Sequence, residues 1–362
     1  MKKLSKNTVY NLSTYGIVIV AYLIVQGIVL AGGLSNQIRG QLVPICVYIS
    51  LAISLNLVSG VSGELSLGHA GFMSVGAFSG VIVAAALRDS GMGGVPILII
   101  SMIVGGVISG IAGLIIGIPV LRLRGDYLAI VTLAFGEIIK NIINNLYVAV
   151  DARGLHFSMT SADGFNLSEG GRVVINGPMG ATGITKLASF TMGVVLIIFT
   201  LFVVLGTINS RHGRAIMAAR DNRIAADSVG ISVTRCKLLA FTVAAVLAGM
   251  AGALYAMNYS TVAAKKFDFN TSILILVFVV LGGMGNIRGS IIAAAILTLL
   301  PELLRSVADY RMLVYAIVLI LVMLARNSTV LKNYINNVVN GIVSQIKAPF
   351  SGRNGGKGGA SE

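Results

Sequence analysis

The chain has 362 residues, of which 56% are hydrophobic and only 11% are charged, and its mean hydropathy is +0.90. This composition excludes a soluble domain, which could not bury so much apolar surface, and makes the lipid bilayer the solvent of the chain. The formal net charge of +14 would suggest a nucleic-acid partner in a soluble protein. In a membrane protein it indicates a cytoplasmic excess of Lys and Arg beside anionic lipid, so no nucleic acid is expected.

Apolar runs that approach 20 residues predict an all-α polytopic membrane protein. The ten predicted transmembrane helices lie near residues 12–32, 41–59, 66–87, 95–119, 126–147, 187–209, 238–257, 269–287, 290–307 and 312–326. They form a transmembrane domain over 12–326, between an N-terminus of residues 1–11 and a tail of residues 327–362. The tail is predicted to be disordered from about residue 351, where Gly and Ser dominate. A polar, Gly-containing loop over 148–186 is predicted to be external.

The distribution of Lys and Arg predicts the orientation of these helices. If the N-terminus is cytoplasmic, 17 of the 27 Lys and Arg lie in the inner loops and the tail, 9 lie outside, and Lys140 lies within a span. An excess of positive charge marks the cytoplasmic side. Both termini are therefore predicted to be cytoplasmic.

A basic, helix-competent segment over residues 210–237 stands between two of the apolar runs and reads SRHGRAIMAARDNRIAADSVGISVTRCK. Asp221 or Asn222 is a candidate N-cap, and Gly230 can end a helix in the left-handed conformation. An Arg and an Asp four residues apart stiffen the second half of the segment. The pattern predicts two short helices that form a docking surface for another protein at the membrane.

The sequence contains no catalytic motif: HExxH, GxSxG, CxxC and a phosphate-binding loop are all missing, and the three histidines lie in different regions. The chain is therefore predicted not to be an enzyme and to bind no metal or cofactor. Ionisable residues within the spans are too sparse for a proton relay. Glu137 and Lys140 share a helical face, so they form either a structural ion pair or a contact with a substrate. His69 either lines a water-filled path or bonds to nearby backbone, and Glu64 is predicted to be solvated at the inner surface.

Glycines four residues apart predict close approach between helices within the chain. The pairs are Gly76/Gly80, Gly106/Gly110, Gly113/Gly117 and Gly285/Gly289. They favour a compact bundle and carry no information about a substrate.

Four stretches carry a resemblance to a known family. They are SGELSLGHAGFMSVGAF (62–78), RGDYLAIVTLAFGEIIKNIINN (124–145), the basic segment, and LVFVVLGGMGNIRGSIIAAAIL (276–297). In their order and spacing they resemble the membrane permease subunits of branched-chain amino acid ABC importers, the LivM type. The resemblance implies a type II importer-like bundle of about ten helices in a bacterial cytoplasmic membrane. It also implies a homologous LivH-like permease as a heterodimer partner, two cytoplasmic ABC ATPase subunits that use ATP and Mg, and an external substrate-binding protein.

The basic segment resembles the coupling region of importer permeases, which reads Glu-Ala-Ala, three further residues, and Gly. Here Ile224 stands at the Glu position, and Asp227 supplies the acid instead. The residues that the resemblance implies in ATPase coupling are Arg214, Arg220, Asp221, Asn222, Arg223, Ala225, Ala226, Asp227 and Gly230.

Backbone rich in glycine near residues 66–71 predicts where a substrate passes. A broken membrane helix can offer amide and carbonyl groups to the charged ends of an amino acid. The expected pathway residues are Ser66, Gly68, His69, Gly71, Thr132, Phe135, Gly136 and Glu137, of which Thr132, Phe135 and Gly136 rest on the family resemblance alone.

Two alternative functions are left open by the sequence. The same machinery could carry nucleosides, urea or short amides. A function of another class, an ion-coupled secondary carrier or channel, predicts transport by this chain without ATPase subunits.

Overall fold

The computed structural model describes residues 6–33, 35–88, 90–123, 125–151, 154–160, 165, 171–304, 313–314, 316–317 and 319–320, and side chains from residue 11 onward. The chain divides into one unit over Met1–Glu302 and a second over Leu303–Glu362. The account below concerns the first unit. Of the predicted helix 312–326 only residues 313–314, 316–317 and 319–320 are described, and they are helical. The predicted tail 327–362 is entirely outside the described residues.

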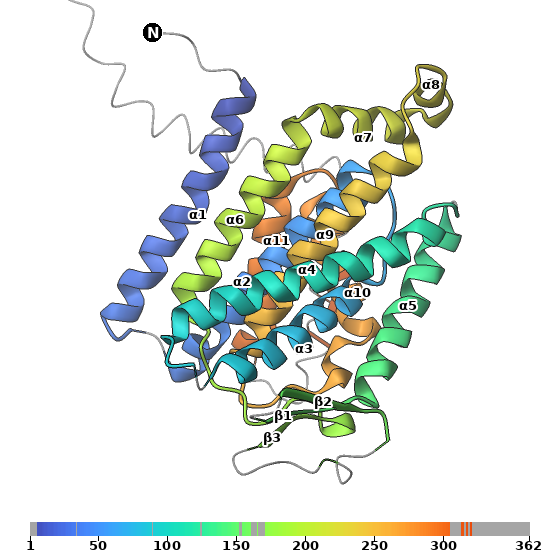
Figure 1. Cartoon of the computed structure of the whole chain (residues 1–362). Coiled ribbons are helices and arrows are strands. Elements are labelled where there is room, and N and C mark those ends of the chain that lie inside the picture. Colours follow the sequence, from blue (N-terminus) through green and yellow to red (C-terminus); the bar gives the residue numbers. More distant parts are fainter. Residues whose placement is uncertain are drawn as a thin grey trace, which may run out of the picture. The chain divides into compact units, whose positions relative to one another are not determined.

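The first unit is a bundle of apolar helices (Figure 1). Its helices are α1 (Lys6–Leu30), α2 (Asn36–Asn56), α3 (His69–Leu87), α4 (Gly94–Val120), α5 (Asp126–Asn144), α6 (Phe190–Asn209), α7 (Arg211–Asp221), α8 (Arg223–Ser228), α9 (Val233–Ala256), α10 (Phe269–Gly282) and α11 (Ile287–Leu303). Six of them, α1 to α4, α6 and α9, have the length and hydropathy to cross a membrane within the described part of the chain. The predicted helical membrane fold is confirmed.

Several boundaries differ from the predicted ones for local reasons. The predicted helix 66–87 begins only at His69, after an extended stretch. The predicted helix 269–287 ends at Gly282, because Gly283 and Gly285 adopt positive φ angles of 106° and 83° and turn the chain. The helix expected at 238–257 begins at Val233, so the last residues of the basic segment belong to α9.

Small residues bring α3, α4 and α9 together at the centre of the bundle. A Cβ on Gly76 of α3 would collide with the backbone of Gly249 in α9, and one on Gly80 would lie 2.7 Å from the Cβ of Ala253. Glycines at 106, 110, 113 and 117 of α4 face α9 in the same way. Three of the four predicted glycine pairs therefore pack helices together within the chain.

The fourth pair, Gly285/Gly289, does not join two helices. Gly285 lies in the turn between α10 and α11, and Gly289 packs against Gly282, the last residue of α10. The amide of Gly285 donates to the Oδ1 of Asn56 at 2.8 Å. Gly60, in the turn that continues α2, has to be small for this approach, because a Cβ there would lie 2.2 Å from the amide nitrogen of Gly285.

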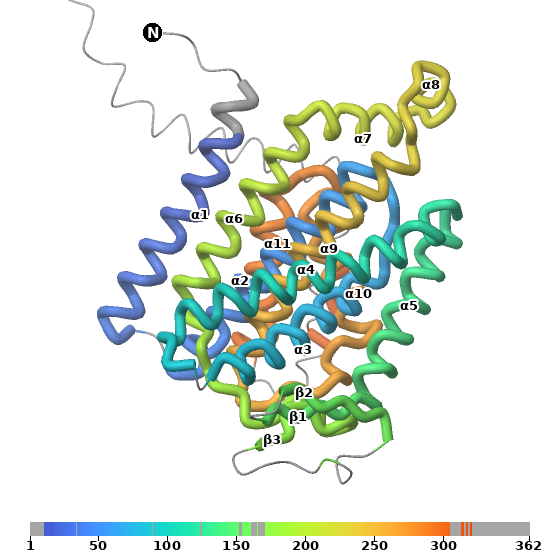
Figure 2. Tube along the Cα trace, in the orientation of Figure 1, coloured from blue at the N-terminus to red at the C-terminus, as the bar shows by residue number. Residues whose placement is uncertain are grey.

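The predicted external loop 148–186 contains regular structure that the sequence pattern did not indicate. Three short antiparallel strands, β1 (Tyr147–Asp151), β2 (Gly154–Ser158) and β3 (Arg172–Asn176), form a sheet in the order β2-β1-β3. The sheet lies at the end of the bundle opposite to α7 and α8 (Figure 2). The helical bundle thus carries a small β-sheet at one end and a pair of short helices at the other.

Candidate functional site

The polar end of the bundle is built on α7, α8 and the turn into α9; we call residues 210–232 the platform. The hydroxyl oxygen of Ser210 accepts from the amide of Gly213 at 3.1 Å and caps α7 as the chain leaves α6. The side chain of Asn222 accepts from the amide of Ala225 at 3.0 Å and caps α8. Of the two predicted N-caps, Asn222 therefore caps the helix, whereas Asp221 is the last residue of α7.

The platform has a small apolar core of its own. Ala219 of α7, Ala226 of α8 and Val233 of α9 are buried together, with Ile231 packed against them. Gly230 has a φ of 83°, as predicted, and its amide donates to the carbonyl of Asp227 at 3.0 Å. Caps and core together hold two short helices in a fixed arrangement that neither would keep alone.

The charged side chains predicted on the platform lie on its surface and at the place where α7 follows α6. Arg223 and Asp227 form the predicted i, i+4 pair at 4.0 Å, with both side chains more than one third exposed. Such an exposed pair adds little stability. Arg214 donates to the carbonyl of Asn209 at 3.2 Å and so ties α7 to the end of α6.

Two apolar side chains on the platform were not predicted as contact residues. Ile224 is 83% exposed and Val229 is 73% exposed, whereas Ala226 between them is buried. Ile224 stands at the position where the coupling pattern has Glu. Apolar side chains displayed on a capped, charged surface are typical of a protein-binding site.

Beneath the platform, an extended stretch over residues 62–68, which we call the connecting segment, links it to the bundle. The guanidinium of Arg220 donates to the carbonyl of Gly60 at 3.1 Å, and also to the carboxylate of Asp221. A Cβ on Gly63 would lie 2.6 Å from the Cγ of Arg220. Arg220 of the platform therefore packs directly on the backbone at Gly63, where a larger residue would collide with it.

A second contact joins the connecting segment to α9. Glu64 forms an ion pair with Lys237, and their side chains are only 13% and 14% exposed. The prediction that Glu64 is solvated at the surface is wrong, because Lys237 covers it at the start of α9. A half-buried pair of this kind costs desolvation and is retained where geometry has to be fixed.

The other end of the connecting segment meets α5. The amide of Leu67 donates to the Oγ1 of Thr132 at 3.0 Å, and a Cβ on Gly68 would collide with the carbonyl of Thr132. One turn later Gly71 approaches the Cα of Gly136, to which an added Cβ would lie 2.9 Å away. The structure thus brings together predicted residues that are more than 60 positions apart in the sequence.

The remaining predicted pathway residues have separate surroundings. His69 is buried, and its Nε2 lies 2.8 Å from the Oγ of Ser54 in α2, so it joins α2 to α3. Ser66 is buried with no hydrogen-bond partner for its hydroxyl among the described atoms. Glu137 pairs with Lys140, and Phe135 is partly exposed.

A small hollow lies where α3, α5 and α10 meet. Gly71, Gly136 and Glu137 line it together with Ser272 of α10, and it does not admit a water molecule. The hydroxyl of Ser272 accepts from the amide of Ala70 at 3.1 Å, which satisfies the first turn of α3. Around this hollow the described parts of α3, α5 and α10 are therefore in close contact.

An apolar bundle with several spanning helices and a capped, surface-displayed helix pair defines a multi-pass membrane protein of the permease class. The family model described as "Branched-chain amino acid transport system / permease component" matches residues 37–323. The chain belongs to this family.

Relatives of the chain agree with this assignment. It is 36% identical over 289 residues to the high-affinity branched-chain amino acid transport system permease protein LivM of Salmonella typhimurium, covering 77% of this chain and 66% of the relative. Against LivM of Escherichia coli the identity is 36% over 295 residues with the same coverage. LivH of Salmonella typhimurium is 25% identical over 304 residues, covering 78% of this chain and 91% of the relative. The chain therefore spans just under two thirds of the length of the LivM relatives. No solved structure matches it.

Proposed function

We propose that this chain is a membrane-spanning permease subunit of an ATP-driven importer for branched-chain or related amino acids. The observation that carries the proposal is the platform, with two capped helices and two exposed apolar side chains joined by Arg220 to the backbone beside α3. A surface of this form can bind another protein and transmit that protein's movement to the helical bundle. Family membership and the printed names of the LivM relatives support branched-chain amino acids as the cargo.

In the proposed mechanism, ATP hydrolysis takes place in two cytoplasmic ATPase subunits that bind ATP and Mg, and this chain supplies no catalytic group. Ile224 and Val229 insert into a groove on an ATPase, as the apolar side of an amphipathic helix does. Movement of the platform then acts on the connecting segment through Arg220 and Lys237. Because that segment bonds to Thr132, the movement reaches α5.

The partners and orientation follow from the same proposal. Both termini and the platform lie in the cytoplasm of a bacterial cell, and the sheet lies outside, where an external binding protein delivers substrate. The relation to both LivM and LivH relatives supports a second, homologous permease as partner. Because the hollow at Gly71 and Gly136 is closed within this chain, we place the substrate pathway between this chain and the partner permease. Its contacts with the substrate are weak, since the external binding protein selects the substrate.

The platform assignment is tested by Ile224→Asp, with Met179→Asp as the matched control. Both side chains are exposed, by 83% and 64% respectively, but Met179 follows β3 at the opposite end of the bundle. Burial of such a side chain contributes about 2 kcal/mol, and adding a charge costs more. We expect Ile224→Asp to reduce ATPase copurification in mild detergent by about tenfold or more, and Met179→Asp to leave it unchanged. Equal retention by both variants would place the ATPase contact elsewhere.

The cargo and the energy source are tested in liposomes that contain the complete complex and its binding protein. We expect uptake of radiolabelled leucine that requires ATP on the side of the liposome membrane where the ATPase subunits lie. A binding protein that takes only nucleosides, urea or short amides would overturn the amino-acid assignment. Transport by this chain alone, driven by an ion gradient, would overturn the importer assignment and support a secondary carrier or channel.

A further inference from the structure

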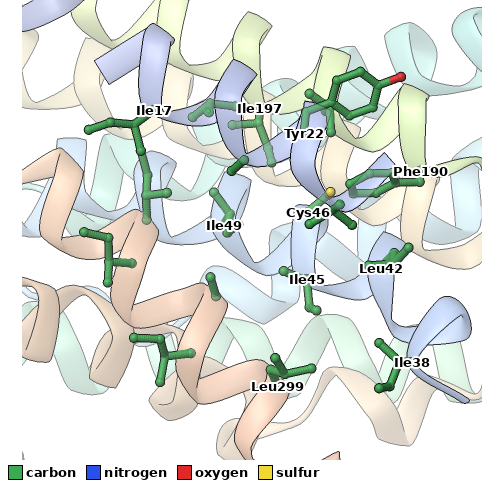
Figure 3. A pocket seen from close by; sticks show the side chains of 18 of the residues that line it. Ile17, Tyr22, Ile38, Leu42, Ile45, Cys46, Ile49, Phe190, Ile197 and Leu299 are labelled. Carbon is green, nitrogen blue, oxygen red and sulfur yellow. The ribbon is translucent and has the colours of Figure 1, made fainter. Parts of the chain in front are cut away.

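An apolar cavity of about 420 Å³ lies within the membrane-spanning part of the bundle, away from the platform and the connecting segment. Four helices contribute to it: α1, α2, α6 and α11 (Figure 3). Its lining consists of aliphatic and aromatic side chains, together with the thiol of Cys46. Of these, Tyr22 has a hydroxyl within 3.3 Å of the Oγ1 of Thr191. Such a lining offers almost nothing to a polar ligand and suits a hydrocarbon.

The dimensions of the cavity identify the kind of hydrocarbon. Its lining residues on α1 run from Ile17 to Ile28, which is a length of about 17 Å along a helix. The space is therefore elongated, and its length and apolar lining suit an alkyl chain that lies along α1.

The weak attachment of α1 explains why the space exists. Only 11% of the best apolar window in α1 is buried, and its packing is mainly against α6. Side-chain contacts hold α1 to the bundle at different heights. Tyr22 lies against Phe190 with ring centroids 5.5 Å apart, and the Nε of Arg288 donates to the Oγ1 of Thr14 at 2.9 Å. Between these contacts Ile17, Val18 and Ala21 of α1 line the cavity.

An arginine lies near each end of the cavity: Arg39, which follows the lining residue Ile38, is exposed, whereas Arg288 at the other end is half-buried. Arg288 is half-buried in the first turn of α11, one turn from the lining residues Ile291 and Ile292. Its partner Thr14 is one turn from the lining residue Ile17. This end is the platform end of the bundle, because the neighbouring turn packs on Gly60, whose carbonyl accepts from Arg220. A half-buried guanidinium one turn beyond an apolar lining matches a phosphate that is linked to an acyl chain.

We propose that this cavity is a binding site for one anionic phospholipid of the platform-side leaflet. One acyl chain lies between α1, α2 and α11, and the phosphate of the headgroup lies at Arg288. The lipid completes the packing of α1, which the protein alone leaves open. This site is separate from the proposed pathway, so its occupancy does not depend on the identity of the cargo.

The experiment uses the assembled complex in nanodiscs of phosphatidylglycerol and phosphatidylcholine in equal parts. Either lipid is added as a trace probe with a photoreactive diazirine in the acyl chain, and labelled peptides are identified by mass spectrometry. We expect labelling of the α1, α2 and α11 peptides that line the cavity, with the phosphatidylglycerol probe preferred. Equal labelling by the two probes in the wild-type complex would overturn the headgroup assignment.

Two pairs of variants separate the acyl chain from the headgroup. Ala295→Phe places a ring inside the cavity and should reduce the labelling of its lining, whereas Leu23→Phe, on the exposed side of α1, should not. Arg288→Gln should lower the preference for phosphatidylglycerol about fivefold, the factor that one basic side chain contributes at an anionic membrane surface. Arg39→Gln is its control, because Arg39 lies at the opposite end, where it donates to the carbonyl of Val29.

The outcomes that overturn the site are equally specific. Unchanged labelling of the lining peptides in Ala295→Phe would show that the chain binds elsewhere. Cross-linking of a cysteine placed at position 295 to a protein segment, from this chain or the partner permease, would show that protein occupies the space. If Ala295→Phe does not fold, the smaller Ala295→Val must give intermediate labelling, and its failure to do so rejects the proposal. Loss of transport with normal labelling would instead reject the proposed function alone.

Discussion

The first two helices of the bundle have the same mean hydropathy of 2.0 but opposite surroundings. In α1 only 11% of the apolar window is buried, whereas in α2, continued by the π-helical turn Leu57–Val61, 89% is buried (Figure 1). Hydropathy therefore reports that both helices belong in a bilayer and says nothing of which one is surrounded by protein. In a membrane, burial does not come from apolarity, because lipid is as apolar as leucine.

What distinguishes α2 is its small and polar side chains. The Oγ of Ser54 lies 2.8 Å from the Nε2 of His69 in α3. The side chain of Asn56 donates to the Oγ of Ser290 at 2.9 Å and accepts from the amide of Gly285 at 2.8 Å. Polar groups of this kind join helices because hydrocarbon offers them no other partner. In α1, by contrast, the described contacts lie near its two ends.

The largest expected difference between the two helices comes from removing a leucine side chain. Leu51 of α2 is fully buried, and Leu23 of α1 is 62% exposed. Leu51→Ala leaves a cavity among protein atoms and should lower the free energy of unfolding by about 2–5 kcal/mol. Leu23→Ala only replaces a side chain by lipid and should change it by less than about 0.5 kcal/mol. Unfolding in mixed micelles measures both, and equal losses would contradict the burial difference.

The next prediction extends the comparison to glycines. Gly76→Ala in α3 places a Cβ against the backbone of Gly249, which cannot move aside, whereas Gly27 in α1 has no atom near its missing Cβ. We expect Gly76→Ala to cost about 1–3 kcal/mol through overpacking. Gly27→Ala should be neutral or stabilise by up to about 1 kcal/mol, because alanine favours the helix. The midpoint of thermal unfolding in detergent measures the stability of the two variants relative to wild type. An unchanged midpoint in Gly76→Ala would show that α3 and α9 can move apart to accept the extra methyl group.

The sequence predicted the class of fold because composition and long apolar runs require a bilayer. It also predicted which glycines pack α3 and α4 against α9, because a spacing of four places them on one helical face. It failed for Gly285/Gly289, since the same spacing also occurs across a turn, where Gly285 has a positive φ. The sheet formed by β1, β2 and β3 was missed because its strands have five residues each, which is too short for a reliable alternating pattern.

The candidate site was predicted in part. The platform could be recognised from its caps and from Gly230, because those signals are local in the sequence. The ion pair of Glu64 with Lys237 and the contact of Arg220 with Gly60 could not, since they join residues 173 and 160 positions apart. Pairings at that distance depend on how the helices are arranged, which periodicity in a single sequence does not specify. No local signal separates Ile224, exposed on α8, from an apolar residue that packs inside.

The smallest expected effect concerns the only side-chain hydrogen bond that joins α1 to α6 among the described residues. The hydroxyl of Tyr22 lies 3.3 Å from the Oγ1 of Thr191 at an exposed position. Hydrogen bonds between membrane helices contribute about 0.6 kcal/mol on average, so Tyr22→Phe should lower stability by no more than about that amount. The ring itself remains against Phe190. Cross-linking between cysteines placed on α1 and α6, measured in wild type and in Tyr22→Phe, reports whether α1 stays in place. Unchanged cross-linking is expected, because the apolar packing of α1 against α6 remains in the variant; a large loss would mean that α1 depends on this polar contact, as α2 depends on its own.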